Sequence, residues 1–172
     1  MTKDPAILTS NSGTEIAIQY CPCGSQLSYP HCCQPTISGL QQAATAEALM
    51  RSRYSAFALG EADYLIATTH PDYRQGLDRQ SLIDPQMRWL GLQIIATTLG
   101  GERDASGQVR FIATFIEAGQ FGTLEENSSF SRIDQRWYYR NGDTQVRTLK
   151  PERNAPCPCG STLKFKRCCG KR

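Results

Sequence analysis

All eight cysteines of this 172-residue chain lie in two short segments, one toward each end. Both segments read Cys-Pro-Cys-Gly-Ser-x-Leu-x-aromatic-x-x-Cys-Cys, from Cys21 to Cys33 and from Cys157 to Cys169. The glycine after each Cys-x-Cys pair lets the backbone turn at low cost, so the Cys-Cys pair can return to the same place. The spacing predicts two clusters of four sulfur atoms: Cys21, Cys23, Cys32 and Cys33, and then Cys157, Cys159, Cys168 and Cys169.

Four thiolates around one ion are the usual coordination of structural zinc, and such a site has no open position for catalysis. Disulfides are the first alternative, but two of them inside so short a segment would close small loops that give little stabilisation. A thiol redox protein that uses the Cys-x-Cys pairs is the second alternative, and it requires accessible thiolates of low pKa. We expect two structural Zn²⁺ ions, one in each cluster.

The adjacent Cys-Cys pair raises the question of whether His31 replaces a cysteine as a ligand. Neighbouring side chains on a helix diverge by about 100°, and neutral imidazole suits zinc. The equivalent residue of the second copy is Arg167, which cannot bind a metal ion. If the two copies work alike, four thiolates bind each metal ion and His31 lies outside the ligand set.

The two copies differ in charge. Residues 147–172 hold eight Lys or Arg and one acidic residue, whereas no Lys or Arg lies between Tyr20 and Gln34. A basic tail on an acidic body attracts anionic partners over a distance, although a merely solubilising tail has the same composition. The residues that we expect to contact a partner are Lys164, Phe165, Lys166, Arg167, Lys171 and Arg172.

Composition places the chain among ordinary globular proteins. Hydrophobic residues make up 40% and charged residues 20% of it, which excludes a disordered chain. No apolar stretch approaches the roughly 20 residues that a membrane-spanning helix needs. The N-terminal segment lacks the apolar core of a secretory signal. We therefore expect a cytoplasmic protein with no membrane partner.

Helical periodicity dominates the first half of the region between the cysteine segments. Thr45 and Gly60 are the predicted caps of a first helix, and further helical turns are predicted within 61–70 and 79–90. The apolar stripe of the first helix is predicted to consist of Leu49, Met50, Tyr54, Phe57 and Ala58.

Strand patterns dominate the second half. Residues 92–99 are rich in β-branched side chains, and 121–133 and 136–142 read as further strands. Between them Val109, Phe111, Ala113 and Phe115 alternate with residues of the opposite face. Asn141-Gly142 is a turn signal. Helices followed by antiparallel strands predict an α+β fold.

The cysteine spacing with its Pro-Cys-Gly-Ser resembles the SEC-C motif, the small zinc module at the C-terminus of the secretion ATPase SecA. The resemblance implies that all eight cysteines are zinc ligands. It also implies an acidic protein partner, as the chaperone SecB is for SecA; ribosomal or other RNA is the other anionic partner that the basic tail suits. The first copy keeps the aromatic residue of the family pattern but lacks its lysines.

The region between the cysteine segments resembles the nuclear transport factor 2-like (SnoaL-like) cone fold. Its stretches LMRSRYSAF, ADYLIATTHP, ENSSF and RWYYRNG, framed by the two cysteine segments, are similar to the YchJ family of uncharacterised bacterial proteins. The resemblance implies an N-terminal zinc knuckle over 1–40, a cone-fold domain over 41–148 and a basic C-terminal zinc knuckle over 149–172. The family usually has a basic or imidazole residue around Glu125 or Asn127, which this chain lacks.

A cone fold encloses a space between its sheet and its helices, which can be a pocket. The polar candidates in this region are Arg51, Arg53, Tyr54, His70, Glu117, Glu125, Glu126 and Tyr138, and the expected pocket consists of Arg53, Tyr54, Glu126 and Tyr138. Structural roles are the competing explanation for several of these residues, with ion pairs for Arg51 and Arg53 and capping for His70. No nucleophile, base and oxyanion set can be assembled, so no catalytic residue is assigned.

These observations predict a zinc-binding interaction module, a binding protein rather than an enzyme, which docks on a protein or RNA through its basic C-terminal knuckle. The first alternative is an enzyme or small-ligand carrier that uses a pocket in the central domain. The second alternative is the thiol redox protein described above.

Overall fold

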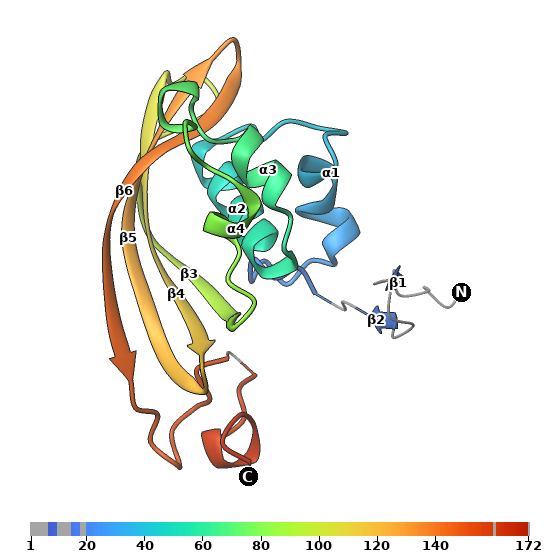
Figure 1. The fold of residues 1–172 in the computed structure, drawn as a ribbon, viewed down its shortest axis with the longest axis vertical. Helices are drawn as coiled ribbons and strands as arrows, with labels where there is room; N and C mark the ends of the chain where they lie inside the picture. The colour runs from blue at the N-terminus through green and yellow to red at the C-terminus, as the bar shows by residue number, and fades with distance from the viewer. Residues whose placement is uncertain (1–6, 10–14, 18–19, 160, 172) are drawn as a thin grey trace.

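Four long antiparallel strands form a curved sheet, and helices cover its concave face (Figure 1). The computed structural model describes residues 7–9, 15–17, 20–159 and 161–171. Neighbours in the sheet follow the chain order, so the sheet is a simple meander, and the predicted α+β class is confirmed. Its strands are β3 (Met87–Leu99), β4 (Ser106–Glu117), β5 (Gln120–Ile133) and β6 (Arg136–Leu149).

The turn predicted at Asn141-Gly142 is wrong, because β6 continues through both residues. The tight turn between β5 and β6 instead falls at Asp134 and Gln135, whose positive φ angles are 48° and 64°, as a two-residue hairpin loop requires. A Cβ atom at position 142 would collide with the side chain of Glu126 on β5. This glycine therefore marks a close approach between strands rather than a turn.

The main helix is α2 (Ala46–Leu59), and its caps are those predicted. The Thr45 hydroxyl accepts a hydrogen bond of 3.0 Å from the amide of Ala48, and Gly60 ends the helix with a φ of 77°. The apolar stripe is wrong at one position, because Ala58 is exposed and Ala56 is fully buried. The other predicted helical turns are present as α3 (Ala62–Ala67) and α4 (Arg79–Leu82).

The main core lies between α2 and the sheet. Leu49, Met50 and Tyr54 of the helix are buried there, and burial of such apolar side chains is the largest favourable contribution to folding. From the sheet come Val109, Phe111, Ala113, Phe130 and Trp137, and the alternation predicted along β4 is confirmed.

The opposite face of α2 packs on the first cysteine segment. Ser55 contacts Cys21, and Leu59 packs against the buried cysteines of that segment. Residues four apart on a helix share one face, so α2 separates the sheet core from a second, smaller core. Its buried members are Cys21, Cys23, Tyr29 and Cys33.

The remaining elements are short. Near the N-terminus, β1 (Ile7–Thr9) pairs antiparallel with β2 (Glu15–Ala17). The others are η1 (Tyr29–His31), α1 (Gln34–Ile37), η2 (Pro71–Tyr73) and η3 (Phe165–Arg167). In the part of the chain that the structure describes, no helix has both the length and the apolar character needed to cross a bilayer.

Candidate functional site

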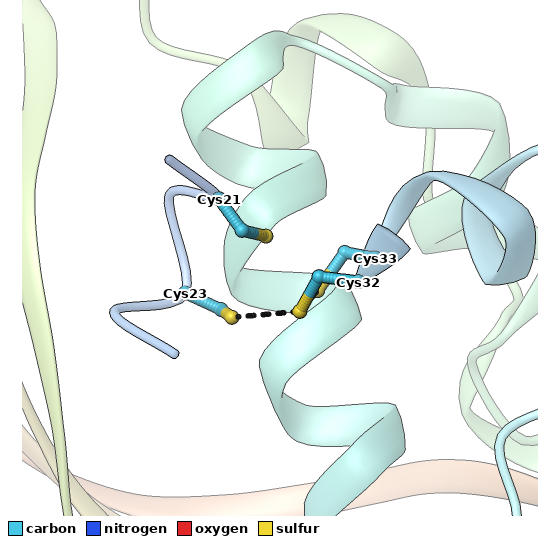
Figure 2. A group of neighbouring side chains, drawn as sticks. All are labelled: Cys21, Cys23, Cys32 and Cys33. Atoms are coloured by element: carbon cyan, nitrogen blue, oxygen red, sulfur yellow. Dashed lines mark hydrogen bonds between the residues drawn. The ribbon is translucent and has the colours of Figure 1, made fainter. Parts of the chain in front are cut away.

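The first four cysteines converge on one point beside α2. Cys21 and Cys23 come from the loop before η1, whereas Cys32 and Cys33 come from the turn that leads into α1, and all four sulfur atoms point toward one another (Figure 2). The Sγ atoms of Cys23 and Cys32 are 3.5 Å apart, those of Cys32 and Cys33 are 3.8 Å apart, and all four lie within 4.8 Å of one another.

These separations fit a tetrahedral metal site. Zinc binds sulfur at about 2.3 Å, so two ligands at a tetrahedral angle are about 3.8 Å apart. A disulfide bond requires about 2.05 Å between sulfur atoms, and all eight cysteines are free. The cluster therefore has the donor set and the spacing that hold a soft or borderline divalent ion, with four ligands and no open position.

In the absence of a cation, the thiols of the first cluster favour one thiolate, that of Cys23, and disfavour those of Cys32 and Cys33. Hydrogen bonds from Cys21 and Cys33 lower the pKa of Cys23 far below its usual value. Burial raises the pKa of Cys32 to about 11, and sulfur–sulfur hydrogen bonds with Cys21 and Cys23 raise that of Cys33 still further. A bound dication would compensate this crowding of negative charge, because it favours the deprotonated form of every ligand.

The first cluster is fastened to α2. Arg51 donates from Nη1 to the carbonyl oxygen of Cys23 at 3.0 Å, and its Nε contacts the Glu47 carboxylate at 2.8 Å. The Sγ of Cys21 lies 3.5 Å from the buried hydroxyl of Ser55. Of the four cysteines only Cys32 is partly exposed. His31 is exposed and lies outside the cluster, with its Nδ1 2.8 Å from the hydroxyl of Ser28.

The second cluster repeats the local geometry of the first. The sulfur atoms of Cys159 and Cys168 are 3.4 Å apart, those of Cys168 and Cys169 are 3.9 Å apart, and Cys157 completes the group. Cys157 alone of the four is buried, and burial raises the pKa of Cys169 to about 12.

Each copy also has a serine beside its sulfur cluster, which was not among the predicted site residues. The hydroxyl of Ser25 lies 3.1 Å from the sulfur of Cys32, and Ser161 donates to the sulfur of Cys168 over the same distance. A donor to a ligand sulfur orients that ligand and stabilises its thiolate. The sequence signal for this role is that a serine occupies the same position in both cysteine segments, as Ser25 and Ser161.

The second knuckle sits at the far end of the sheet, below the first in Figure 1, and an aromatic pair joins it to β5. The rings of Phe165 and Phe121 pack edge to face with their centres 5.3 Å apart. Phe165 therefore faces the sheet, although the sequence placed it among the partner-contacting residues.

A basic groove runs between this knuckle and the segment that precedes it. It has a volume of about 490 Å³, and Arg153, Lys166 and Lys171 are its charged residues. Pro151, Phe165 and Gly170 complete the groove. We call this the basic groove. Lys164 and Arg167 are exposed but lie outside it, and Arg172 lies outside the described residues. Arg153 was not among the residues predicted to contact a partner.

A separate cavity of about 520 Å³ lies between α2 and the concave face of the sheet. Three of the four residues predicted for a pocket line it: Arg53, Tyr54 and Glu126. Tyr138 does not; its neighbour Tyr139 lines the cavity instead, because successive residues of a strand point to opposite faces.

The remaining polar candidates have structural partners elsewhere. Arg51 pairs with Glu47, as described above, and Glu125 accepts a hydrogen bond of 2.9 Å from Arg110 on the neighbouring strand. Glu117 is exposed. His70 caps η2 by accepting from the amide of Asp72 at 3.2 Å, so its capping role is at the start of a helix rather than at the end.

Comparison with known proteins shows which families share this architecture. A family model described as the YchJ middle NTF2-like domain matches residues 45–142, and the SEC-C motif matches residues 153–171. A UPF0225 protein of Serratia proteamaculans is 45% identical over 157 residues, which cover 89% of this chain and 99% of the relative. The UPF0225 protein YchJ of Shigella dysenteriae is 43% identical over 157 residues, covering 89% of this chain and 99% of the relative.

Two solved structures have the same fold. A SEC-C motif containing protein from Rhodopseudomonas palustris is 36% identical and superimposes with a TM-score of 0.66, over 72% of this chain and 96% of its own. A second one, from Psychrobacter arcticus, is 34% identical with a TM-score of 0.64, over 89% of this chain and 96% of its own. With its NTF2-like middle domain and its SEC-C motif, the chain belongs to the UPF0225 family, which includes YchJ.

Proposed function

We propose that this protein is an interaction module in which two zinc-stabilised knuckles have different roles. The first knuckle is a structural part of the body, and the second presents the basic groove to an acidic protein segment. The observation that carries this proposal is that the groove has three cationic residues and no acidic one. The described segment 20–34 of the first knuckle has no equivalent surface, because it is packed on α2 and contains no Lys or Arg.

An acidic peptide suits the groove better than single-stranded RNA. Sequence-tolerant RNA binding relies on aromatic side chains on which bases stack. The aromatic ring in this groove, Phe165, already packs on Phe121. Ammonium and guanidinium groups lining a groove suit rows of carboxylates, to which they donate charge-assisted hydrogen bonds.

The zinc ions would give the groove its shape. A knuckle of this size cannot bury a core of its own and depends on metal for folding. The amide of Phe165 donates to the carbonyl of Ala155 at 2.8 Å, and that of Lys166 donates to Arg153 at 3.0 Å. These bonds place the chain segment before the cluster along the folded knuckle, so loss of the metal would disperse the three cations.

Charge reversal inside and outside the groove tests this proposal. The full chain is titrated with a fluorescent hexaglutamate peptide and with a twelve-nucleotide single-stranded RNA. The test variant is Lys166→Glu with Lys171→Glu. The control is Lys164→Glu with Arg167→Glu, which makes the same change in net charge on the same knuckle but outside the groove.

We expect the groove variant to lose peptide binding by about a hundredfold and the control by less than about fivefold, because contact pairs outweigh screened distant charges. Equal losses of peptide affinity in both variants would mean that the peptide responds only to the net charge of the knuckle, and this result would contradict the proposal. Tighter binding of the RNA, with the steeper salt dependence of phosphate contacts, would identify a nucleic acid as the partner instead.

A thiol redox role has less support. Such a role needs accessible thiolates, and three of the four cysteines of the first cluster are buried. Both clusters bring all four sulfur atoms together rather than pairing two.

A further inference from the structure

We propose that the central cavity binds a small organic monocarboxylate with an aromatic or branched apolar body, held by the side chain of Arg53. This site is separate from the two knuckles. It lies on the opposite face of α2 from the first cluster, and the groove of the second knuckle shares none of its residues.

The guanidinium of Arg53 is only partly used by the fold. It is 5% exposed, and its Nη1 donates to the carbonyl of Leu65 at 2.8 Å and to the hydroxyl of Thr68 at 2.7 Å. Its Nε and Nη2 have no hydrogen-bond partner among the described residues, and neither is sealed from solvent. Because Arg53 lines the cavity, the proposal assigns these two free donors to the ligand.

This arrangement matches a carboxylate. Nε and Nη2 form the side of a planar fork that donates two parallel hydrogen bonds to a carboxylate group. The ring of Tyr139 lies under the guanidinium, 4.6 Å from Cζ to the ring centre, and fixes its plane. Burial lowers the pKa of Arg53 only to about 10, so the group stays charged at neutral pH.

The charged residues of the cavity favour a single negative charge on the ligand. Arg53 and Arg140 are the cations of the lining, and Glu126 is its carboxylate. Glu126 is already held by hydroxyl donors, at 3.2 Å from Tyr139 and 3.0 Å from Thr144, and also by Ser128. Arg140 is exposed and donates to the Tyr73 hydroxyl at 3.2 Å, so Arg53 is the buried cation of the lining, and a carboxylate would neutralise the excess positive charge.

The rest of the lining selects an apolar body. The cavity volume of about 520 Å³ lies within the range of about 300–1,000 Å³ typical of small-molecule sites. Aromatic and aliphatic side chains make up most of its wall, and they include Met50, Tyr54, Phe57, Trp89, Phe111 and Leu124.

The test compares isosteric probes on the zinc-loaded full chain. Benzoate, 2-naphthoate and 4-methylpentanoate are titrated by calorimetry against their neutral amides and the corresponding primary amines. Location is read from the indole N–H signals in nitrogen-15 spectra. Trp89 lines the cavity, whereas Trp137 donates its indole N–H to the carbonyl of Ala44 at 3.2 Å and serves as the reference.

We expect at least one carboxylate to bind about tenfold more tightly than its amide, because it adds two charge-assisted hydrogen bonds. Its binding should shift the Trp89 signal and leave that of Trp137 in place. Arg53→Gln should abolish the preference for the acid. Because that change also removes bonds to Leu65 and Thr68, a second variant is needed that keeps Arg53.

Glu126→Gln provides that variant, since it keeps a side chain of the same shape and removes a negative charge near the expected carboxylate. We expect it to tighten carboxylate binding about fivefold. The control is Glu125→Gln: Glu125 pairs with Arg110 and does not line the cavity, so this substitution should leave carboxylate affinity unchanged. Ala113→Phe fills the cavity and should abolish binding of acid and amide alike. Equal affinity for acid and amide, tighter binding of the amine, or no binding of any carboxylate in the panel would overturn the proposal.

Discussion

Arg51 of α2 holds the backbone of the first metal cluster, because its Nη1 donates to the carbonyl oxygen of Cys23 at 3.0 Å. The same guanidinium is held in turn by Glu47, one helical turn earlier. One side chain therefore links the helix that covers the sheet to the loop that carries two of the four sulfur atoms. This link explains how a small cysteine-rich segment becomes part of the body of the protein.

Replacing Arg51 by methionine should loosen this link without changing the metal ligands. We expect the free energy of unfolding to fall by about 1–2 kcal/mol, because a charge-assisted hydrogen bond to the carbonyl of a buried residue is lost. Zinc should also leave the first cluster several times faster. Chemical denaturation and a colorimetric zinc-release assay would measure the two effects.

The matched control is Glu47→Gln, which breaks the ion pair but leaves the bond to Cys23 possible. Exposed pairs one turn apart contribute less than about 0.5 kcal/mol, so this variant should behave nearly as wild type. Equal effects of the two substitutions would show that the ion pair, rather than the bond to the cluster, is what matters.

Gly142→Ala should be destabilising although the residue lies on an outer strand. The new Cβ would collide with the side chain of Glu126, which three hydroxyl groups hold in place. Overpacking of this kind costs about 1–3 kcal/mol. Thermal unfolding should show the loss, whereas Gly91→Ala should be tolerated because the nearest atom to its Cβ would be 4.0 Å away. An unchanged melting temperature for Gly142→Ala would contradict the close approach.

Phe121→Ala should detach the second knuckle from the end of the sheet. Its ring supplies the edge-to-face contact with Phe165, and such pairs contribute about 0.5–1.5 kcal/mol beyond the area that they bury. We expect faster hydrogen exchange in residues 153–171 with an unchanged zinc content. Val146→Ala, on the exposed surface of β6, is the control. Unaltered exchange in the tail would mean that other contacts hold the knuckle.

Chelator should remove the two metal ions in a fixed order. Only Cys157 is buried in the second cluster, whereas three cysteines are buried in the first, which also packs on α2. We expect the second ion to leave first, with little loss of sheet signal in circular dichroism. Cys169→Ser and Cys33→Ser should each remove one kinetic phase, fast and slow respectively. Release of both ions in one phase would show that the clusters are equally protected.

Local signals in the sequence were sufficient for the elements that depend on them. Thr45 and Gly60 cap α2 as predicted, because capping depends on a few adjacent residues. The sulfur clusters were predictable for the same reason, since each lies within one short segment. Gly142 misled the prediction because its role depends on Glu126 from the neighbouring strand, which local pattern does not show.

The sites that depend on distant segments were predicted only in part. Arg53, Tyr54 and Glu126 were identified by chemistry, but Tyr138 was chosen where the alternation along β6 directs Tyr139 into the cavity. The basic groove was missed because it requires the segment at Arg153 to fold back along the knuckle. Composition predicted a basic tail, and only the fold separates groove residues such as Lys166 from outward-facing ones such as Lys164.

Element analysis of the purified full chain, prepared without chelator or oxidant, is the most direct measurement of whether each sulfur quartet holds a metal ion. We expect two zinc ions per chain, and one ion in Cys33→Ser and in Cys169→Ser. Thiol reagents should react slowly until a chelator is added. A metal-free protein whose Cys-x-Cys pairs form reversible disulfides would contradict the proposal that the two ends of this chain are closed metal centres.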